Sequence, residues 1–161
     1  MKNNVKSGIL FKSGDCNYNT DIFSNFSLHI YKNQLTMDML LVRPLRMGLK
    51  GHVVFNFRLG KAQPYRNLFH HDFNYCAMLK GARDSMYGRF FTSMLKVGNF
   101  ATSCPIGTGN YYLHDWALDS KLVPSFLQIG DYRIDGSFYY GNKKQHKDNT
   151  LLLCTVEAIL D

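Results

Sequence analysis

The four cysteines of this chain constrain its fold more than any other feature. Cys16, Cys76, Cys104 and Cys154 are spread along the sequence, and no two of them form the CxxC spacing typical of zinc and redox sites. Cysteines placed in this way, among segments of alternating apolar residues, favour a disulfide framework. Such frameworks persist in oxidising compartments outside the cytosol. We therefore predict a secreted, extracellular protein with two disulfide bonds.

Length and charge limit the class of protein further. The 161 residues are enough for one domain with its own core, and we expect an N-terminal segment over residues 1–13 and a single domain over residues 14–161. In the first segment only Ile9–Phe11 resembles the apolar part of a signal peptide and is too short for one, so we expect a signal peptide to be absent or truncated. The formal charge of +7 suits contact with anionic membranes or glycans, whereas secretion argues against nucleic acid as a partner.

Alternation of apolar and polar residues predicts a series of strands. Leu28–Tyr31 and Leu35–Leu41 alternate on either side of a turn at Lys32–Gln34, and Pro44 ends the second strand. The clearest strand places Val53, Phe55, Phe57 and Leu59 on an inward apolar face and His52, Asn56 and Arg58 on the outward face. Two later strands have the apolar faces Tyr132, Ile134, Phe138 and Tyr140, and Leu152, Cys154, Val156 and Ala158.

The apolar period changes to that of a helix between Ala82 and Lys96, and Gly98 follows as a stop signal. A single short helix among many strands indicates a mostly β protein. We predict one immunoglobulin-like antiparallel β-sandwich with one short helix.

These elements favour one of the three possible cysteine pairings. Cys154 lies on the apolar face of the last strand and Cys16 precedes the first, so a bond between them would join the two ends of the sandwich. Cys76 and Cys104 bracket the helix, so a bond between them would hold that insertion against the strands. We predict both bonds, with Cα atoms within about 7 Å of each other; the sequence alone leaves the other pairings open.

Histidines raise two chemical alternatives. His70, His71 and Asp72 are metal-ligand types, but neighbours on a strand point to opposite faces, which keeps the three from converging easily on one ion. His114 and Asp115 resemble a general base with its orienting carboxylate, but neither a nucleophile motif nor paired carboxylates accompany them. We therefore predict a protein with no catalytic activity, no metal and no cofactor.

Two surface features fit a secreted protein. Lys143, Lys144 and Lys147 form the densest basic run, which is most often a solvated loop but would also suit contact with anionic headgroups. Asn25 begins an Asn-Phe-Ser triplet that matches the N-glycosylation sequon. We predict an anionic-surface contact at the three lysines and glycosylation at Asn25.

Six short motifs carry a family resemblance: Phe73–Cys76, Gly98–Phe100, Cys104–Ile106, Gly109–Tyr112, Pro124–Leu127 and Gly130–Arg133. In their order and spacing the chain resembles, over roughly residues 14–160, an insect family of small secreted proteins of unknown function that includes the CheB chemosensory proteins. The resemblance implies a fold similar to the ML-type lipid-recognition sandwich of ganglioside-activator and sterol-carrier proteins, in which two sheets admit a lipid between them. It also implies a link to pheromone detection.

The functional prediction joins this resemblance to a surplus of bulky apolar residues, which either fill an ordinary core or line a pocket. We predict a non-enzymatic protein that binds a hydrophobic or lipid ligand between the sheets. The alternative is an extracellular interaction module with a closed core that modulates a receptor or channel. The residues predicted to line the ligand cavity are Phe55, Phe57, Met86, Phe90, Met94, Tyr132, Ile134 and Phe138.

Overall fold

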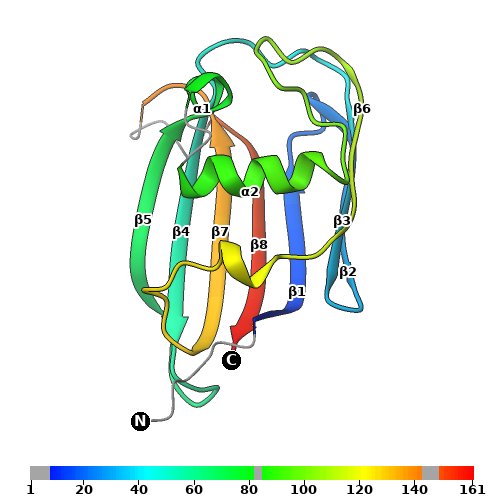
Figure 1. Cartoon of the computed structure of the whole chain (residues 1–161). Helices are drawn as coiled ribbons and strands as arrows, with labels where there is room; N and C mark the ends of the chain where they lie inside the picture. The colour runs from blue at the N-terminus through cyan, green and yellow to red at the C-terminus, as the bar shows by residue number, and fades with distance from the viewer. Residues whose placement is uncertain (1–7, 82–84, 143–148) are drawn as a thin grey trace.

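The computed structural model describes residues 8–81, 85–142 and 149–161. Two antiparallel sheets form a sandwich, which confirms the mostly β prediction (Figure 1). The larger sheet has the strand order β1 (Ile9–Tyr18), β8 (Thr150–Leu160), β7 (Gly130–Tyr139), β4 (Lys50–Arg58) and β5 (Arg66–Asn74). The smaller sheet has the order β2 (Phe23–Tyr31), β3 (Gln34–Leu41) and β6 (Gly109–Trp116). β1 begins at Ile9, ahead of residue 14, where the sequence analysis starts the domain.

Among the described residues there are two α-helices, whereas the sequence pattern predicts one. The helix predicted between Ala82 and Lys96 is α2 (Met86–Leu95). The first residues of the predicted range, 82–84, lie outside the described residues. The additional helix, α1 (Tyr75–Gly81), begins at an N-cap, because the side-chain oxygen of Asn74 accepts a hydrogen bond from the Ala77 amide at 2.9 Å. A short 3₁₀ turn, η1 (Ser120–Leu122), precedes β7. Among the described residues, no helix is long and apolar enough to cross a membrane.

The turn between β2 and β3 links the two sheets. Lys32 and Asn33 adopt positive φ angles of 49° and 60°, as a two-residue type I′ hairpin turn requires. The Asn33 side chain accepts a hydrogen bond from the Phe11 amide at 2.7 Å and donates one to the Ile9 carbonyl at 3.0 Å. The hairpin of the small sheet is therefore fastened to β1, an edge strand of the large sheet.

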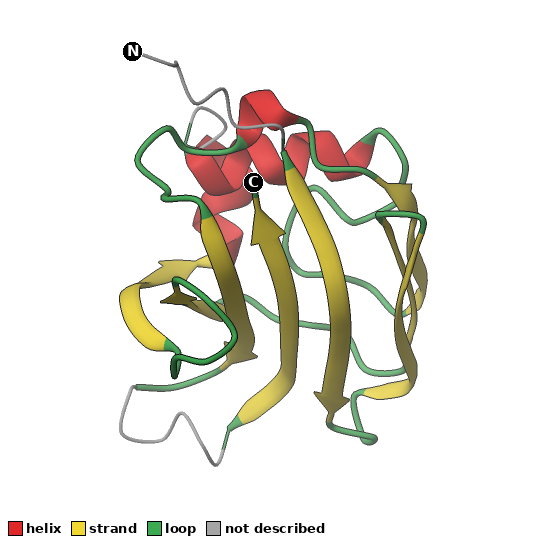
Figure 2. Ribbon diagram, turned by 90° about the horizontal axis from the view of Figure 1, so that it is seen from below, coloured by secondary structure: helices red, strands yellow, loops and turns green. Residues whose placement is uncertain are grey.

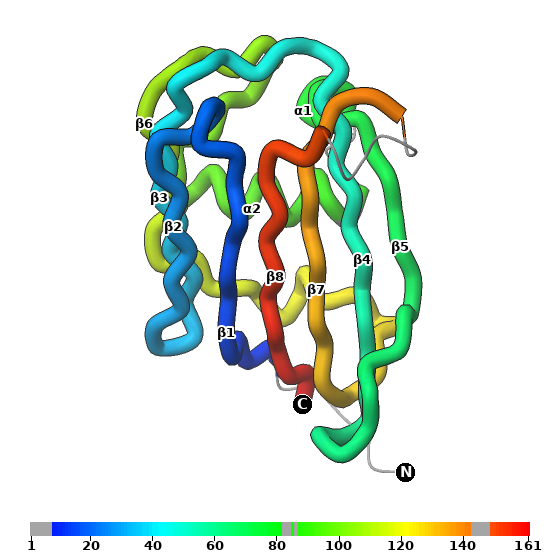
Figure 3. The backbone as a smooth tube through the Cα atoms, turned by 180° about the vertical axis from the view of Figure 1, so that it is seen from behind, coloured from blue at the N-terminus to red at the C-terminus, as the bar shows by residue number. Residues whose placement is uncertain are grey.

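Helix α2 lies across one face of the five-stranded sheet, which we call the inner face (Figure 1). The ring of Tyr87 on α2 stacks on Phe73 and on His71 of β5, each at 5.3 Å between centroids. At the other side, the Trp116 indole of β6 donates a hydrogen bond to the Ser93 hydroxyl of α2 at 3.0 Å. Figure 2 shows the helices grouped on one side of the strands, and Figure 3 shows the opposite, outer face of the large sheet with α2 behind it.

Both predicted disulfide bonds are confirmed. Cys16 and Cys154 are directly opposed on β1 and β8, with Cα atoms 4.1 Å apart, and Cys16 lies within the first strand rather than before it. Cys76 on α1 bonds to Cys104 in the segment between α2 and β6, with Cα atoms 5.7 Å apart. Two disulfide bonds are compatible with an extracellular protein.

The prediction for β4 is correct for part of the strand. Phe55 and Phe57 lie on the inner face, but Leu59 lies beyond the end of the strand and is 69% exposed, so its predicted burial is wrong. Asn56 lies on the outer face and is only 7% exposed. Its amide group donates to the Arg133 carbonyl at 3.3 Å and to the Asp135 carboxylate at 3.2 Å, so neighbouring side chains of β7 bury it.

In the part of the chain that the structure describes, buried apolar residues gather in three clusters, and Met37 packs against both the first and the second. The first surrounds Cys76 at the α1 end of the sandwich, the second contains Leu113 and Trp116 of the small sheet, and the third contains Tyr132 and Leu160 at the other end of the large sheet. The clusters reach the middle of the inner face from β8, where Cys154 packs against the first and Val156 against the second.

Candidate functional site

The candidate site is the inner face of the two central strands β4 and β7. Their antiparallel register opposes Gly51 with Phe138, Val53 with Gly136, Phe55 with Ile134 and Phe57 with Tyr132. Because side chains alternate along a strand, all eight residues belong to one face. The structure therefore brings together the five strand residues predicted to line a ligand cavity: Phe55, Phe57, Tyr132, Ile134 and Phe138.

Open space lies over Gly136 in the middle of this face. A Cβ atom built on Gly136 would meet no described atom within 4 Å outside its own chain neighbours. Val53 and Cys154 flank Gly136 on the adjacent strands, and both are only half-buried although a helix covers this face of the sheet. Ile134, the next inward residue on β7, is also half-buried. The centre of the inner face is thus less tightly filled than its two ends.

Gly51, on the same face, has the opposite environment. A Cβ atom at Gly51 would lie 2.3 Å from the tip of the Phe73 ring of β5. This ring lies over the glycine and meets Phe138 edge-to-face at 6.5 Å between centroids. The missing side chain of Gly51 is therefore replaced by an aromatic ring from the neighbouring strand, whereas no described side chain replaces that of Gly136.

Helix α2 covers the site on the side opposite the sheet (Figure 1). Phe90 and Phe91 are half-buried, and the Phe91 ring stacks on Phe100 at 6.3 Å. Met94 packs against the cluster around Trp116 instead, on the side of the small sheet. Met86 is the first residue of α2, and its side chain lies outside the described set.

Aromatic contacts close the end of the site beyond Phe55. Tyr132 is 3% exposed, lies 5.1 Å from Phe57 and donates its hydroxyl to the Gln128 carbonyl at 2.7 Å. Phe55 stacks on Phe69 at 4.5 Å. Because of these contacts, the side chains at the end of the site that contains Phe57 and Tyr132 are tightly packed.

Tyr75 places a polar group at the opposite end of the site. It is the first residue of α1, and its ring meets Phe138 at 5.5 Å and Phe91 at 6.2 Å, both edge-to-face. Burial raises the pKa of Tyr75 from 10.0 to about 12, because desolvation penalises the charged phenolate. Within the described part of the chain, its hydroxyl has no hydrogen-bond partner, although the side chain keeps some solvent access. The arrangement combines an apolar lining with a neutral hydrogen-bonding group, as small-molecule pockets do.

Residues 51–134 match the family described as Protein of unknown function (DUF1091), and this segment is just over half of the chain. The chain belongs to this family. The DUF1091 segment starts in β4 and ends in β7, so it includes both helices and the Cys76–Cys104 bond. No curated protein matches the chain.

Two residues of this DUF1091 protein's candidate site, Gly136 and Tyr75, were not predicted from the sequence. Gly136 interrupts the inward alternation of Tyr132, Ile134 and Phe138 with a position that has no side chain. That interruption can be detected in the sequence. The sequence does not show whether the space over the glycine stays open. Tyr75 carried no such signal, because its place depends on α1.

The other predicted residues of the DUF1091 chain lie away from this site. Asn25 is exposed on β2, where glycosylation stays a prediction. His114 Nε2 lies 2.9 Å from Asp38 on the neighbouring strand, not against Asp115, whose backbone is left-handed with φ of 56°. This geometry does not form the pair of base and orienting carboxylate that was considered as an alternative for His114 and Asp115. The predicted anionic-surface residues, Lys143, Lys144 and Lys147, lie outside the described residues.

Proposed function

We propose that this protein binds a hydrophobic ligand of the lipid class between α2 and the inner face of β4 and β7, without transforming it. The observation that carries the proposal is the open space over Gly136, at the centre of a face lined by half-buried apolar side chains. An apolar ligand placed there would gain roughly 25 cal/mol per Å² of apolar area removed from water. The costs of association are subtracted from that gain.

The proposed setting is extracellular, and the proposed ligand is of the pheromone type. Two disulfide bonds support secretion. The likeness of the six motifs to the insect family that includes the CheB proteins supports a chemosensory role, and the ML-type likeness supports a ligand between two layers. A receptor or an anionic membrane would then be the partner that receives the ligand, in keeping with the net charge of +7.

Replacing Gly136 by leucine tests the location of the ligand. The side chain would enter the open space, so we expect at least a tenfold weaker affinity for a fluorescent fatty acid or sterol, measured by titration and displacement. The melting temperature should stay the same or rise, because a glycine within a strand costs roughly 0.5–1 kcal/mol relative to alanine. A folded variant that binds as the parent does would contradict the proposed location.

Gly60 offers the matched control. Its Cβ position also has no described atom within 4 Å and its φ angle is not positive, but it lies in the connection between β4 and β5. Gly60→Leu should leave ligand affinity unchanged. Absence of binding by the unmodified protein across fatty acids, sterols, glycolipids and long-chain hydrocarbons would favour the interaction module instead.

Replacing Tyr75 by phenylalanine tests whether its hydroxyl contacts the polar group of the ligand. A hydrogen bond contributes about 0.5–1.5 kcal/mol net, so affinity for fatty acids or fatty alcohols should fall about threefold to tenfold. Affinity for a plain hydrocarbon of the same length should not change, because that ligand offers no hydrogen-bonding group. Equal losses for both ligands would show that the substitution acts through packing alone.

A further inference from the structure

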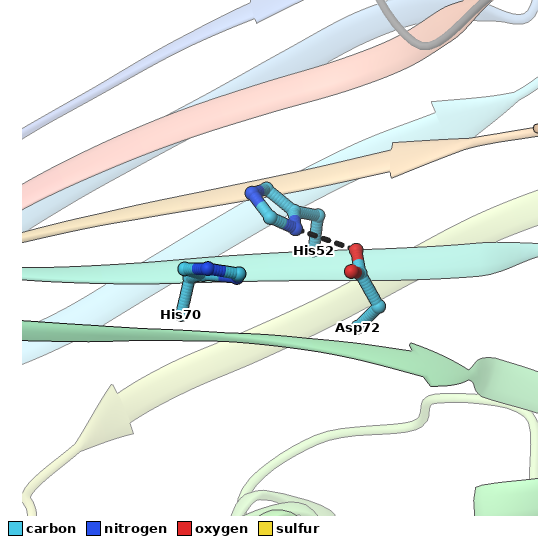
Figure 4. Close-up of side chains that lie close together, drawn as sticks. All are labelled: His52, His70 and Asp72. Carbon is cyan, nitrogen blue, oxygen red and sulfur yellow. Dashed lines mark hydrogen bonds and ion pairs between the residues drawn. The ribbon is translucent and has the colours of Figure 1, made fainter. Parts of the chain in front are cut away.

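A second cluster of side chains lies on the outer face of the large sheet, away from α2. His52 on β4 is directly opposed to Asp72 on β5, and His70 precedes Asp72 by two residues and so shares its face. One ligand-type atom from each residue lies within 4.8 Å of the others. Figure 4 shows the imidazole of His52 and the carboxylate of Asp72 directed at one another, with the ring of His70 beside them.

The cross-strand register explains why these three side chains meet. His70, His71 and Asp72 are consecutive in the sequence, but His71 points away from the other two, since its ring stacks on Tyr87 at the inner face. The third member of the outer cluster comes instead from β4, where His52 is opposed to Asp72. Two imidazoles and one carboxylate make up the ligand set of many zinc sites with an open coordination position.

We propose that His52, His70 and Asp72 bind a divalent transition metal of the Zn²⁺ class. Nδ1 of His52 and Oδ1 of Asp72 lie 2.5 Å apart, whereas two ligands of a tetrahedral zinc stand about 3.3 Å apart for metal–ligand bonds of about 2.0–2.1 Å. A metal therefore replaces the hydrogen bond after a small side-chain rotation. The two side chains are 23% and 26% exposed, which leaves room for that rotation.

The surroundings of the cluster suit a site with an open coordination position. His52 also lines an open hollow of about 460 Å³ on the outer face, together with Val54, Arg133, Asp135, Ser137, Leu153 and Thr155. A metal held by His52 would thus lie at the rim of a space large enough for water or a small ligand. The Tyr139 hydroxyl lies 3.4 Å from Oδ1 of Asp72 and donates to the same oxygen that faces His52, so it helps to hold the carboxylate in place.

Titration of the untagged, disulfide-bonded chain with Co²⁺ tests this site. We expect one Co²⁺ per chain, with the visible absorption bands of a site containing nitrogen ligands, and displacement of Co²⁺ by Zn²⁺ but not by Mg²⁺, which prefers oxygen ligands. His70→Ala and Asp72→Asn should each weaken binding at least tenfold, by loss of one of three ligands. Circular dichroism and an unchanged disulfide content would show that the variants are folded.

His114→Ala is the matched control for these variants. His114 also pairs with a carboxylate, Asp38, but on the small sheet and outside the three-residue cluster. This variant should bind Co²⁺ as the parent does. The proposal is overturned if the parent binds no Co²⁺, or if His70→Ala binds it with unchanged affinity; in either case His52 and Asp72 form a structural hydrogen-bonded pair only.

Discussion

Removal of the Cys16–Cys154 bond is expected to lower the free energy of unfolding by about 4–5 kcal/mol. This bond spans 138 residues, so its loss frees nearly the whole unfolded chain from a cross-link. Since small domains have a total stability of only about 5–15 kcal/mol, the variant Cys16→Ala/Cys154→Ala should lie close to the limit of folding. Urea unfolding followed by circular dichroism at neutral pH measures the difference.

The second disulfide bond provides the comparison. The Cys76–Cys104 bond spans 28 residues, so Cys76→Ala/Cys104→Ala should lose about 1.4 kcal/mol less in the chain-entropy account. The urea dependence should also steepen more for the longer loop, because a less constrained unfolded chain exposes more surface. A larger loss from the short loop would show that packing around Cys76, which is 2% exposed, outweighs loop closure.

The substitution Gly51→Val is expected to lower the free energy of unfolding by about 2–3 kcal/mol, as overpacking of an ordered region does. A Cβ atom at this position would lie within 2.8 Å of three atoms of the Phe73 ring. The ring cannot simply swing away, because it is stacked on Tyr87 and abuts Phe138. Thermal and urea unfolding of the variant measure the loss.

A double-mutant cycle identifies the cause. In a Phe73→Leu background the obstructing ring is gone, so Gly51→Val should cost less than about 1 kcal/mol, since valine suits a strand. Gly136 is the inward residue next to Phe138 on β7, and Phe138 is opposed to Gly51. Gly136→Leu should not lower the free energy of unfolding in either background. An equal cost of Gly51→Val with and without Phe73 would place the strain in the backbone instead of the ring.

Local patterns in the sequence were sufficient for much of the fold. Period-two alternation located β4, β7 and β8, and the turn predicted at Lys32–Gln34 located the β2–β3 hairpin, because these signals depend only on nearby residues. The disulfide pairing followed from which cysteines sit at corresponding ends of the predicted elements. Leu59 was misplaced because alternation gives the face of a residue but not the point at which the strand ends.

The features that escaped prediction depend on partners distant in sequence. Helix α1 is only seven residues long and is held by the Asn74 cap and the Cys76 disulfide, so it has no long apolar period to detect. The opening over Gly136 depends on which side chains α2 presents to the sheet. The cluster of His52 with Asp72 depends on the register of β4 against β5, which a one-residue shift would abolish.

The strand order has a consequence for the synthesis of this protein. β8 is made after the other seven strands of the described residues, yet it lies between β1 and β7 in the interior of the large sheet. Until residue 160 has emerged from the ribosome, β1 has no neighbour in that sheet and β7 is paired on one side only. The growing chain therefore presents two open strand edges, which are sites of mispairing between nascent chains. The large sheet is therefore completed only once β8 has left the ribosome, and chaperones that shield strand edges are most needed before that point.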